Sequence, residues 1–386
     1  MRAHLLLSLL IPSLPLPAQE RLVVADPAAS GCDAAALRQA AAGIEQLVTE
    51  NDLRGAVVLV TRGTSIVLHE AYGCRDVAGE QPMQKDTLFR MASNTKAVTA
   101  AAILHLVERG KVGLDDPASR WFGTFGSGKA AAITVHHLLT HTSGLTIGTL
   151  FVQPLMQPSE RHPDAPNLVL ECARFGEIGP TAAPGSSYSY SNPGYNTLAG
   201  IVTLAGEREF EAYCREAFYR PLGMADTCNL ETRADLSRMS AVMVRAADGS
   251  WRARWQPGDA PTLPFVRGSG GLITTAVDYA KFARLFVTGG VAGERRILSE
   301  DSVARMTGNR IPHLKGRSYG YGWGIAADGS FSHTGSDGTM VWCDPARDLV
   351  GMVLTQTQRS KRLGPARSAF RKAVAAACPV LRPQKK

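Results

Sequence analysis

Hydrophobic positions near the start of the chain recur at the spacing of an α-helix. The apolar residues with this spacing are Leu37, Ala41, Ile44 and Val48. Side chains three or four positions apart share one face of a helix. Asp33, directly before this stretch, is a favoured N-cap. The pattern predicts an amphipathic helix over residues 33–51.

Strand-like segments occupy the next part of the chain and its end. Two apolar runs, residues 55–61 and 65–72, are separated by a three-residue turn segment and predict a β-hairpin. Because the runs are apolar at nearly every position, we expect both faces of the hairpin to be buried. Three further strands are predicted over residues 331–335, 339–343 and 349–356.

A final helix over residues 365–378 completes the predicted order of elements. Its apolar face is formed by Ala366, Phe370, Ala373 and Ala377. Pro379 stops this helix, because proline lacks the N–H group that a helix interior needs. Strands near both ends of the chain predict one α/β domain that the intervening residues interrupt.

The middle of the chain is predicted to be mostly helical. A helix that starts at Ser93 runs until Gly110, and later helical stretches alternate with long loops rich in Pro and Gly. The most extended of these loops are residues 153–166, 180–193 and 256–271. Ordered loops of this length often line binding sites.

These elements predict two structural units. The discontinuous α/β domain comprises residues 19–85 and 311–386, the inserted helical domain comprises residues 86–310, and we expect an active site between them. Residues 1–18 have a basic start and a short apolar stretch, which predicts a cleavable signal peptide. The mature protein would then be periplasmic or secreted, without a stable membrane span.

Composition and charge narrow the class of protein. The chain is 45% hydrophobic and 20% charged, as is usual for a globular protein, and its net charge is +8. The basic residues are scattered, unlike the clustered basic footprint of a nucleic-acid-binding protein. We therefore expect no nucleic-acid partner.

Candidate chemistry begins with Ser93 and Lys96, which lie three positions apart where a helix begins. Residues i and i+3 share a helix face, so the lysine amine can reach the serine hydroxyl. A serine hydroxyl is a poor nucleophile, and a neighbouring basic amine is one way to activate it. Taken alone, the pair is also explained by a helix N-cap and a solvated lysine.

Two more short motifs extend this picture. Tyr190 and Asn192 stand two residues apart in a turn rich in Pro and Gly, which can aim both side chains into one cleft. His333 begins a His-Thr-Gly-Ser sequence at the end of a predicted strand, where Gly335 permits close approach of another backbone. By themselves these motifs are also typical of a packed tyrosine, a turn-forming asparagine and an ordinary edge strand.

In the order Ser-x-x-Lys, Tyr-x-Asn, His-Thr-Gly, the three motifs together resemble the signature of the serine β-lactamase and penicillin-binding-protein superfamily. The Tyr-Ser-Asn form is similar to class C β-lactamases, related DD-peptidases and family VIII carboxylesterases. The resemblance covers residues 33–378 and includes four further segments. These are residues 138–145, 221–224, 270–278 and 319–323.

This resemblance implies a fold. The fold is of the β-lactamase and DD-peptidase α/β type: an antiparallel sheet flanked by the N- and C-terminal helices, plus the inserted, mostly helical domain. In that fold the terminal helices pack side by side, and if they do so here, Cys32 and Cys378 could form a disulfide. The chain has seven cysteines, so at least one thiol stays unpaired in a monomer, and seven free thiols are the alternative.

The resemblance also implies a role for each motif residue. Ser93 would attack a carbonyl carbon and form an acyl-enzyme, with Lys96 and Tyr190 sharing the role of the base. The main-chain N–H groups of Ser93 and Ser336 would stabilise the oxyanion. Asn192 would orient Lys96 or the substrate amide. This chemistry uses no cofactor and no metal.

His333 departs from the family pattern, because most β-lactamases of this lineage have lysine there. A histidine with an ordinary pKa is mostly neutral at pH 7 and attracts a substrate carboxylate less than lysine does. Strong β-lactamase activity is therefore not expected. The His-Thr-Gly form is similar to that of some DD-peptidases and relatives that act on D-amino-acid peptides or esters.

The sequence favours an exported serine hydrolase that forms an acyl-enzyme. Its substrate would be a small molecule or a peptide, with a D-amino-acid peptide, an ester and an amide as the candidates. The substrate could derive from peptidoglycan. One alternative is a penicillin-recognising or peptidoglycan-binding sensor with slow turnover, and another is a true class C-type β-lactamase. A zinc pair at His137 and His141 is a weaker alternative, since no Glu follows His137 as the His-Glu-x-x-His motif requires.

Overall fold

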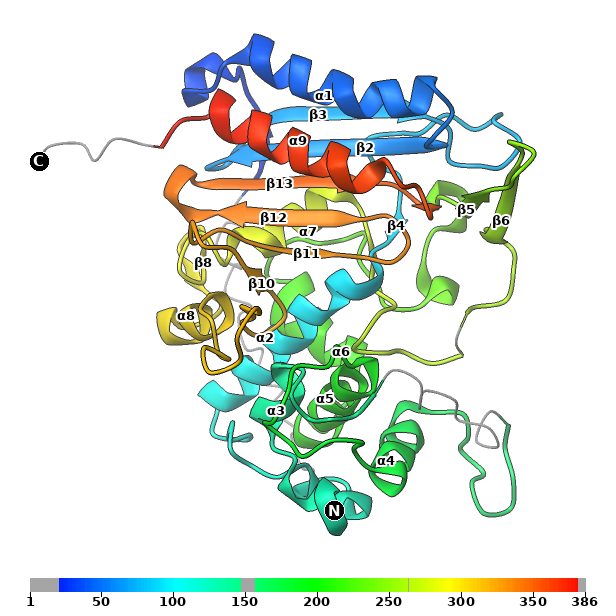
Figure 1. Cartoon of the computed structure of the whole chain (residues 1–386), viewed down its shortest axis with the longest axis vertical. Helices are drawn as coiled ribbons and strands as arrows, with labels where there is room; N and C mark the ends of the chain where they lie inside the picture. The colour runs from blue at the N-terminus through cyan, green and yellow to red at the C-terminus, as the bar shows by residue number, and fades with distance from the viewer. Residues whose placement is uncertain (1–20, 147–156, 263, 381–386) are drawn as a thin grey trace, which may run out of the picture.

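The computed structural model describes residues 21–146, 157–262 and 264–380 (Figure 1). Residues 1–18, the predicted signal peptide, and part of the predicted loop 153–166 lie outside these residues. In the part described, no helix is long and apolar enough to cross a membrane. A large sheet with two helices over one face forms the upper half of the view in Figure 1, and most of the remaining helices lie below it.

The bounds of the elements follow in chain order. The helices are α1 (Ala34–Thr49), α2 (Thr95–Glu108), α3 (Val135–Leu139), α4 (Leu168–Ile178), α5 (Asn192–Ala205), α6 (Phe210–Cys214), α7 (Ala276–Arg284), α8 (Glu300–Thr307) and α9 (Leu363–Ala377). The strands are β1 (Val23–Val24), β2 (Gly55–Arg62), β3 (Ser65–Gly73), β4 (Phe89–Arg90), β5 (Val242–Arg245), β6 (Trp251–Trp255), β7 (Ile273–Thr274), β8 (Val291–Ala292), β9 (Arg295–Arg296), β10 (Gly324–Ile325), β11 (Phe331–Thr334), β12 (Met340–Asp344), β13 (Leu349–Leu354) and β14 (Thr357–Gln358).

The main sheet joins strands from the two ends of the chain. Its order is β1-β3-β2-β13-β12-β11-β10, so the predicted hairpin of β2 and β3 pairs with the three predicted C-terminal strands. All neighbouring pairs are antiparallel except β1 and β3, which are parallel. The predicted β-lactamase-like fold is confirmed, with one parallel pair at its edge.

The position of β2 between two layers of the core explains why its sequence is apolar at nearly every position. Successive side chains of a strand point to opposite faces of the sheet. Val58 and Val60 pack in the cluster beneath the terminal helices, whereas Val57 and Leu59 pack in the larger core on the other face. Every residue of β2 is buried, which confirms the predicted burial of both faces for this strand. The prediction is wrong for most of β3, in which only Ile66, Val67 and Leu68 are buried.

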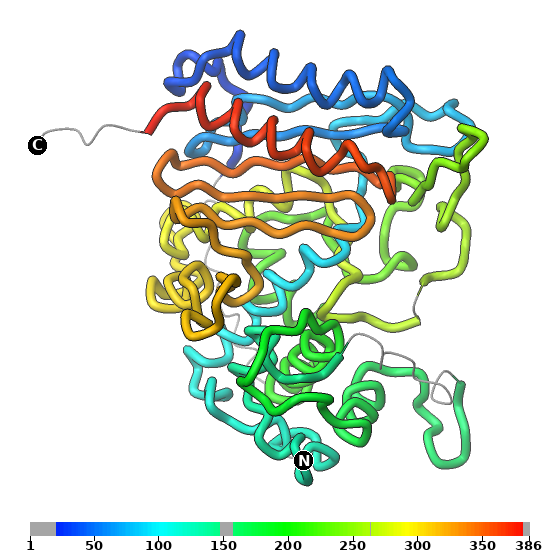
Figure 2. Tube along the Cα trace, viewed as in Figure 1, coloured from blue at the N-terminus to red at the C-terminus, as the bar shows by residue number. Residues whose placement is uncertain are grey.

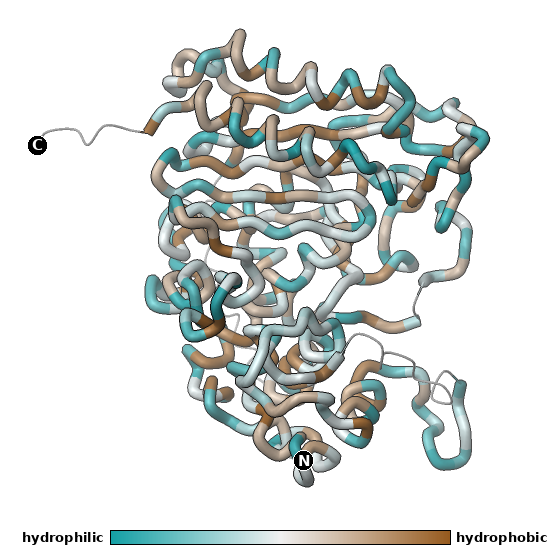
Figure 3. Tube along the Cα trace, viewed as in Figure 1, coloured by the Kyte–Doolittle hydropathy of each residue, from teal (hydrophilic) through white to brown (hydrophobic). Residues whose placement is uncertain are grey.

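The terminal helices α1 and α9 lie side by side on one face of this sheet (Figure 2). The carboxylate of Asp33 caps α1, because one of its oxygens accepts hydrogen bonds from the N–H groups of Ala35 and Ala36. Hydrophobic and hydrophilic residues alternate along both helices (Figure 3). Their apolar faces, which include Ile44 and Phe370, cover the sheet.

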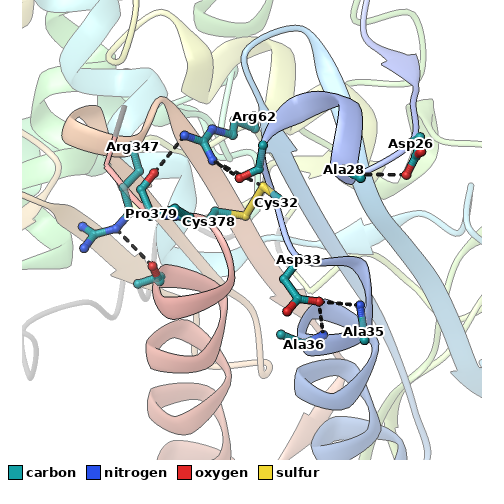
Figure 4. Close-up of a disulfide and its surroundings, with 12 residues drawn as sticks. Asp26, Ala28, Cys32, Asp33, Ala35, Ala36, Arg62, Arg347, Cys378 and Pro379 are labelled. Atoms are coloured by element: carbon teal, nitrogen blue, oxygen red, sulfur yellow. Dashed lines mark hydrogen bonds between the residues drawn. A yellow bond between two sulfur atoms is a disulfide. The ribbon is translucent and has the colours of Figure 1, made fainter. Parts of the chain in front are cut away.

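A disulfide joins the ends of this layer. Cys32, just before α1, is bonded to Cys378, just after α9 (Figure 4), which confirms the pairing that the family resemblance implies. The guanidinium of Arg62, at the end of β2, donates hydrogen bonds to the carbonyl oxygens of Gly31 and Pro379. One arginine therefore connects the segment before α1 and the segment after α9 to the same strand.

Helix α2 lies at the centre of the other half of the molecule. Eleven of its residues are buried, as expected for a helix that is apolar on all sides. The predicted start at Ser93 is wrong in detail, because Ala92–Asn94 form a 3-10 turn and the α-helix begins at Thr95.

The middle of the chain also contains short strands that its polar, irregular sequence did not predict, among them β5 and β6. The predicted domain boundaries stay a prediction.

Replacing both Cys32 and Cys378 by serine is expected to lower the free energy of unfolding by about 2–5 kcal/mol, the usual effect of losing a native disulfide. The bond spans a sequence separation of 346 residues, so its loss restores much conformational freedom to the unfolded chain. Urea unfolding of the wild type and the double variant measures the difference. Cys74→Ser, at a half-buried free thiol, is the matched control, and equal unfolding midpoints in all three proteins would contradict this role.

Candidate active site

Ser93 lies in a tight turn between the sheet and α2. Ala92, directly before it, has a φ of 45°, in the left-handed region that residues other than glycine rarely occupy. Such strained residues tend to cluster at functional sites. The turn sets Ser93 at the wall of a cavity of about 360 Å³, with Ser336 also at its wall.

The amine of Lys96 is buried and surrounded by oxygen atoms. Its Nζ lies 3.0 Å from Ser93 Oγ, 2.8 Å from Asn192 Oδ1 and 2.7 Å from the carbonyl oxygen of Ser269. Burial lowers the pKa of Lys96 well below its ordinary value. A neutral amine has two N–H donors and one lone pair. The two amide-type oxygens can take the donors, which leaves the lone pair for the Ser93 hydroxyl.

Tyr190 approaches Ser93 from another side. Burial raises the pKa of Tyr190 above its ordinary value, and the nearby Ser93 hydroxyl opposes this shift. Lys96 Nζ lies 4.7 Å from the centre of the Tyr190 ring. The Ser93 hydroxyl thus has two neighbours that can exchange protons with it, an amine and a phenol that stays protonated at neutral pH.

Asn192 is the first residue of α5, and the cap of this helix places it. The Ser191 hydroxyl accepts a hydrogen bond from the N–H of Gly194, and Pro193 suits the first turn. The Asn192 side chain is thereby directed to Lys96. The structure brings Ser93, Lys96, Tyr190 and Asn192 together.

Gly335 lets the end of β11 pass next to the Ser93 turn. A Cβ atom at this position would lie 2.6 Å from the carbonyl oxygen of Met91 and 2.3 Å from Thr339 Oγ1, distances at which atoms clash. The Thr339 hydroxyl donates to the same Met91 carbonyl. Ser336, one residue later, reaches the cavity for this reason. Within the described residues, no hydrogen bond occupies the main-chain N–H of Ser93 or Ser336.

His333 lies at the edge of the site and is neutral. Its Nδ1 lies 2.9 Å from the carbonyl oxygen of Thr334, so Nδ1 carries the proton, and Nε2 lies 3.2 Å from the Tyr319 hydroxyl. Burial lowers the pKa of His333 to about 3. The sequence-based expectation of a mostly neutral side chain at pH 7 agrees with this environment.

The charged residues at the wall of the Ser93 cavity are largely paired. Arg90 forms ion pairs with Glu231 at 3.2 Å and Asp337 at 3.6 Å, and Arg267 pairs with the buried carboxylate of Glu171. The aromatic rings of Trp255 and Phe265 also line this cavity. Arg254, at the same wall, is exposed and forms no ion pair among the described residues. The cavity thus combines apolar surface with mostly paired charges.

Several residues of the site were not predicted from the sequence. The carbonyl of Ser269 holds Lys96, and Asn196 holds Ser269 in turn, because Asn196 Oδ1 accepts from the N–H of Ser269. Main-chain acceptors have no sequence signature. His141 and Tyr319 also belong to the site, and the only signal for them was their membership in segments that resemble the family.

The alternative of a zinc pair at His137 and His141 is not supported. His137 Nδ1 bonds to Thr134 at the start of α3, whereas His141 bonds to Ser191 and Tyr319. Among the described residues, no group of three or more His, Cys, Asp or Glu side chains could hold a metal ion.

The fold and the Ser–Lys–Tyr cluster define a protein of the serine β-lactamase and penicillin-binding-protein class. The sequence model of the family described as Beta-lactamase matches residues 40–376, and the chain therefore belongs to this family of β-lactamase-related serine hydrolases.

Individual relatives include both uncharacterised proteins and an esterase. Protein Rv1367c of Mycobacterium tuberculosis is 31% identical over 358 residues, which cover 82% of this chain and 88% of that protein. Esterase EstB of Burkholderia gladioli is 35% identical over 213 residues, 52% of this chain and 54% of EstB. Among solved structures, the octameric penicillin-binding protein homologue from Pyrococcus abyssi is 25% identical, with a TM-score of 0.71, over 88% of this chain and 76% of that chain.

Proposed function

We propose that this protein is an exported serine hydrolase that acts through an acyl-enzyme, with Ser93 as the nucleophile and Lys96 as its base. The observation that carries the proposal is the buried Lys96 amine, 3.0 Å from Ser93 Oγ, with amide-type oxygens on its other sides. Export is supported by the basic start and apolar stretch of residues 1–18.

The proposed reaction proceeds in two halves. Ser93 Oγ bonds to the carbonyl carbon of the substrate as its proton passes to Lys96. The bond to the leaving group then breaks, and this group departs with a proton that Tyr190 delivers and Lys96 replaces. In the second half, water attacks the acyl carbon as its proton passes to the same pair of residues. The bond between Ser93 Oγ and the acyl carbon then breaks, Ser93 Oγ takes that proton back, and the acid is released.

The main-chain N–H groups of Ser93 and Ser336 are the proposed oxyanion donors. Both residues lie at the wall of one cavity. Removing one donor of this kind typically weakens transition-state stabilisation by about 2.7–4 kcal/mol. The close passage of Gly335 past Met91 supports this role, since it brings the two segments together.

An ester is the best supported substrate. A neutral His333 offers no permanent charge for a carboxylate, which disfavours β-lactams and a true class C-type β-lactamase. The cavity beside Ser93 has Trp255 and Phe265 in its wall, and most of its charges are paired, which suits an uncharged acyl group. The similarity to Esterase EstB supports the same choice.

A peptide with a D-amino-acid leaving group is the second candidate. A second cavity, of about 280 Å³, has Tyr190, His333 and Arg317 in its wall. Arg317 is exposed and lies over the ring of Tyr188, 5.5 Å from its centre. A cation there can attract a carboxylate on the leaving group. A slowly deacylating penicillin-recognising or peptidoglycan-binding sensor would use the same residues.

Ser93→Ala is expected to lower the rate of p-nitrophenyl butyrate hydrolysis by about 10³-fold or more, and Lys96→Ala nearly as much, because members of such a unit act together. Intact-protein mass spectrometry should also lose any penicillin or acyl adduct in Ser93→Ala. Ser127→Ala, at an exposed serine that caps no helix with its side chain, is the control. Full activity of pure Ser93→Ala would contradict the proposal, and an adduct without turnover would indicate the sensor.

His333→Lys is expected to raise the ratio of kcat/KM for a carboxylate-bearing cephalosporin to kcat/KM for an uncharged ester by about tenfold, since hydrogen bonds to charged groups are stronger than neutral ones. The side chain lines a cavity, so the lysine ammonium can reach water. The ester is the internal control, because it reports any general effect of the substitution on the site. An unchanged ratio would show that the missing charge at this position does not limit cephalosporin hydrolysis.

A further inference from the structure

His141 occupies an unusual position beside the catalytic cluster. It follows α3 in a turn, it is fully buried, and its φ is 60°. Histidine and asparagine are among the few residues other than glycine that adopt this left-handed conformation at all readily. The turn therefore fixes the direction of an imidazole that the proposed chemistry does not use.

The main chain and the ring of His141 hold the residues on both sides of Tyr190. The His141 carbonyl oxygen accepts a hydrogen bond of 2.8 Å from the N–H of Ser189. Its Nδ1 accepts one of 2.9 Å from the N–H of Ser191. The ring also stacks on Tyr190, with 4.4 Å between centres and 31° between planes. His141 thus contacts the Tyr190 ring and the main chain of both neighbours of Tyr190.

The same ring begins a chain of hydrogen bonds whose direction is determined. Because Nδ1 of His141 accepts from a main-chain N–H, the proton of the neutral ring lies on Nε2, which is 3.2 Å from the Tyr319 hydroxyl. The Tyr319 hydroxyl can then donate to Nε2 of His333 at 3.2 Å, since Nδ1 of His333 donates to a carbonyl oxygen. Main-chain groups at both ends fix both tautomers.

This chain of hydrogen bonds connects two parts of the site whose relative position must be maintained. Ser191 is the cap of α5, next to Tyr190 and Asn192, whereas His333 belongs to β11, three residues before Ser336. His141 contacts the first part directly and the second part through Tyr319. A proton on both nitrogens of either ring would replace an acceptor by a donor and break the chain.

We propose that His141 is a positioning residue that holds Tyr190 directly and orients His333 through the Tyr319 hydroxyl. The proposal rests on the proposed hydrolase function and deepens it, because it names the residues that keep the proton-transferring phenol in place. Asn94 and Thr339 hold other parts of the same turn, but they do not contact Tyr190 in the interactions described.

Two variants separate the contacts of His141. His141→Asn keeps an acceptor atom at the position of Nδ1 and tolerates the left-handed backbone, but it lacks the donor to Tyr319. Tyr319→Phe keeps the ring and removes the hydroxyl that joins the two histidines. His137→Asn, the same substitution four residues earlier at the start of α3, is the control for general damage to this region.

Both variants are expected to lower kcat for p-nitrophenyl butyrate by about 10- to 100-fold with little change in KM, the effect of a displaced catalytic group. His137→Asn should keep the wild-type kcat. In ¹⁵N spectra of the imidazoles, wild-type His333 should carry its proton on Nδ1, held by the Thr334 carbonyl. The resonance of its Nε2 should shift in both variants, because the hydrogen bond from Tyr319 is lost or no longer oriented. If His141→Asn does not fold, Tyr319→Phe still decides the question.

Wild-type kcat in His141→Asn and Tyr319→Phe, with only a lower melting temperature, would overturn the proposal and make His141 purely structural. A His333 protonated on Nε2 in the wild type would overturn it as well. If the wild type neither hydrolyses esters nor becomes acylated at Ser93, the proposed function fails instead. The tautomer spectra still test the hydrogen-bond chain in that case.

Discussion

The burial of one lysine amine is the constraint on which the rest of the structure depends. A charged ammonium is costly to remove from water unless its environment compensates it. Here the hydrogen-bond partners of Lys96 are oxygen atoms without formal charge, and the rings of Tyr190 and Tyr195 lie beside it. The pKa is lowered by burial for this reason. A lysine that is neutral near pH 7 can accept a proton, whereas an ordinary surface lysine cannot.

Holding that amine requires three separate segments to meet. Helix α2 provides Lys96, the cap of α5 provides Asn192, and the loop before β7 provides the Ser269 carbonyl. This loop is fastened to α2, because Thr99 donates to the carbonyl of Gly268 and Thr95 accepts from the N–H of Leu272. The sheet adds the end of β11, which Gly335 allows to pass close to the Ser93 turn. The terminal helices and their disulfide stabilise the far face of that sheet.

The sequence predicted the elements whose signals are local. The spacing of Leu37, Ala41 and Ile44 fixed the first helix, and the continuous apolar run of β2 matched its burial on both faces. Ser93, Lys96, Tyr190 and Asn192 were predicted together only because three short motifs occur in one order. The other parts of the site depend on tertiary contacts. Ser269 acts through a main-chain oxygen, and His141 contacts Tyr319 across 178 positions of sequence, so no local pattern marks either.

The most direct test of this account is the pH dependence of Ser93 acylation, measured as the pre-steady-state burst of p-nitrophenol from p-nitrophenyl butyrate. The account predicts that the burst rate rises with pH through a single apparent pKa well below that of an ordinary lysine, about 10.4, because the neutral amine is the base. The rate should then fall as pH drops and the amine becomes protonated. A burst rate that keeps rising to pH 10 and beyond would show that Lys96 is a normal ammonium and would contradict the central claim.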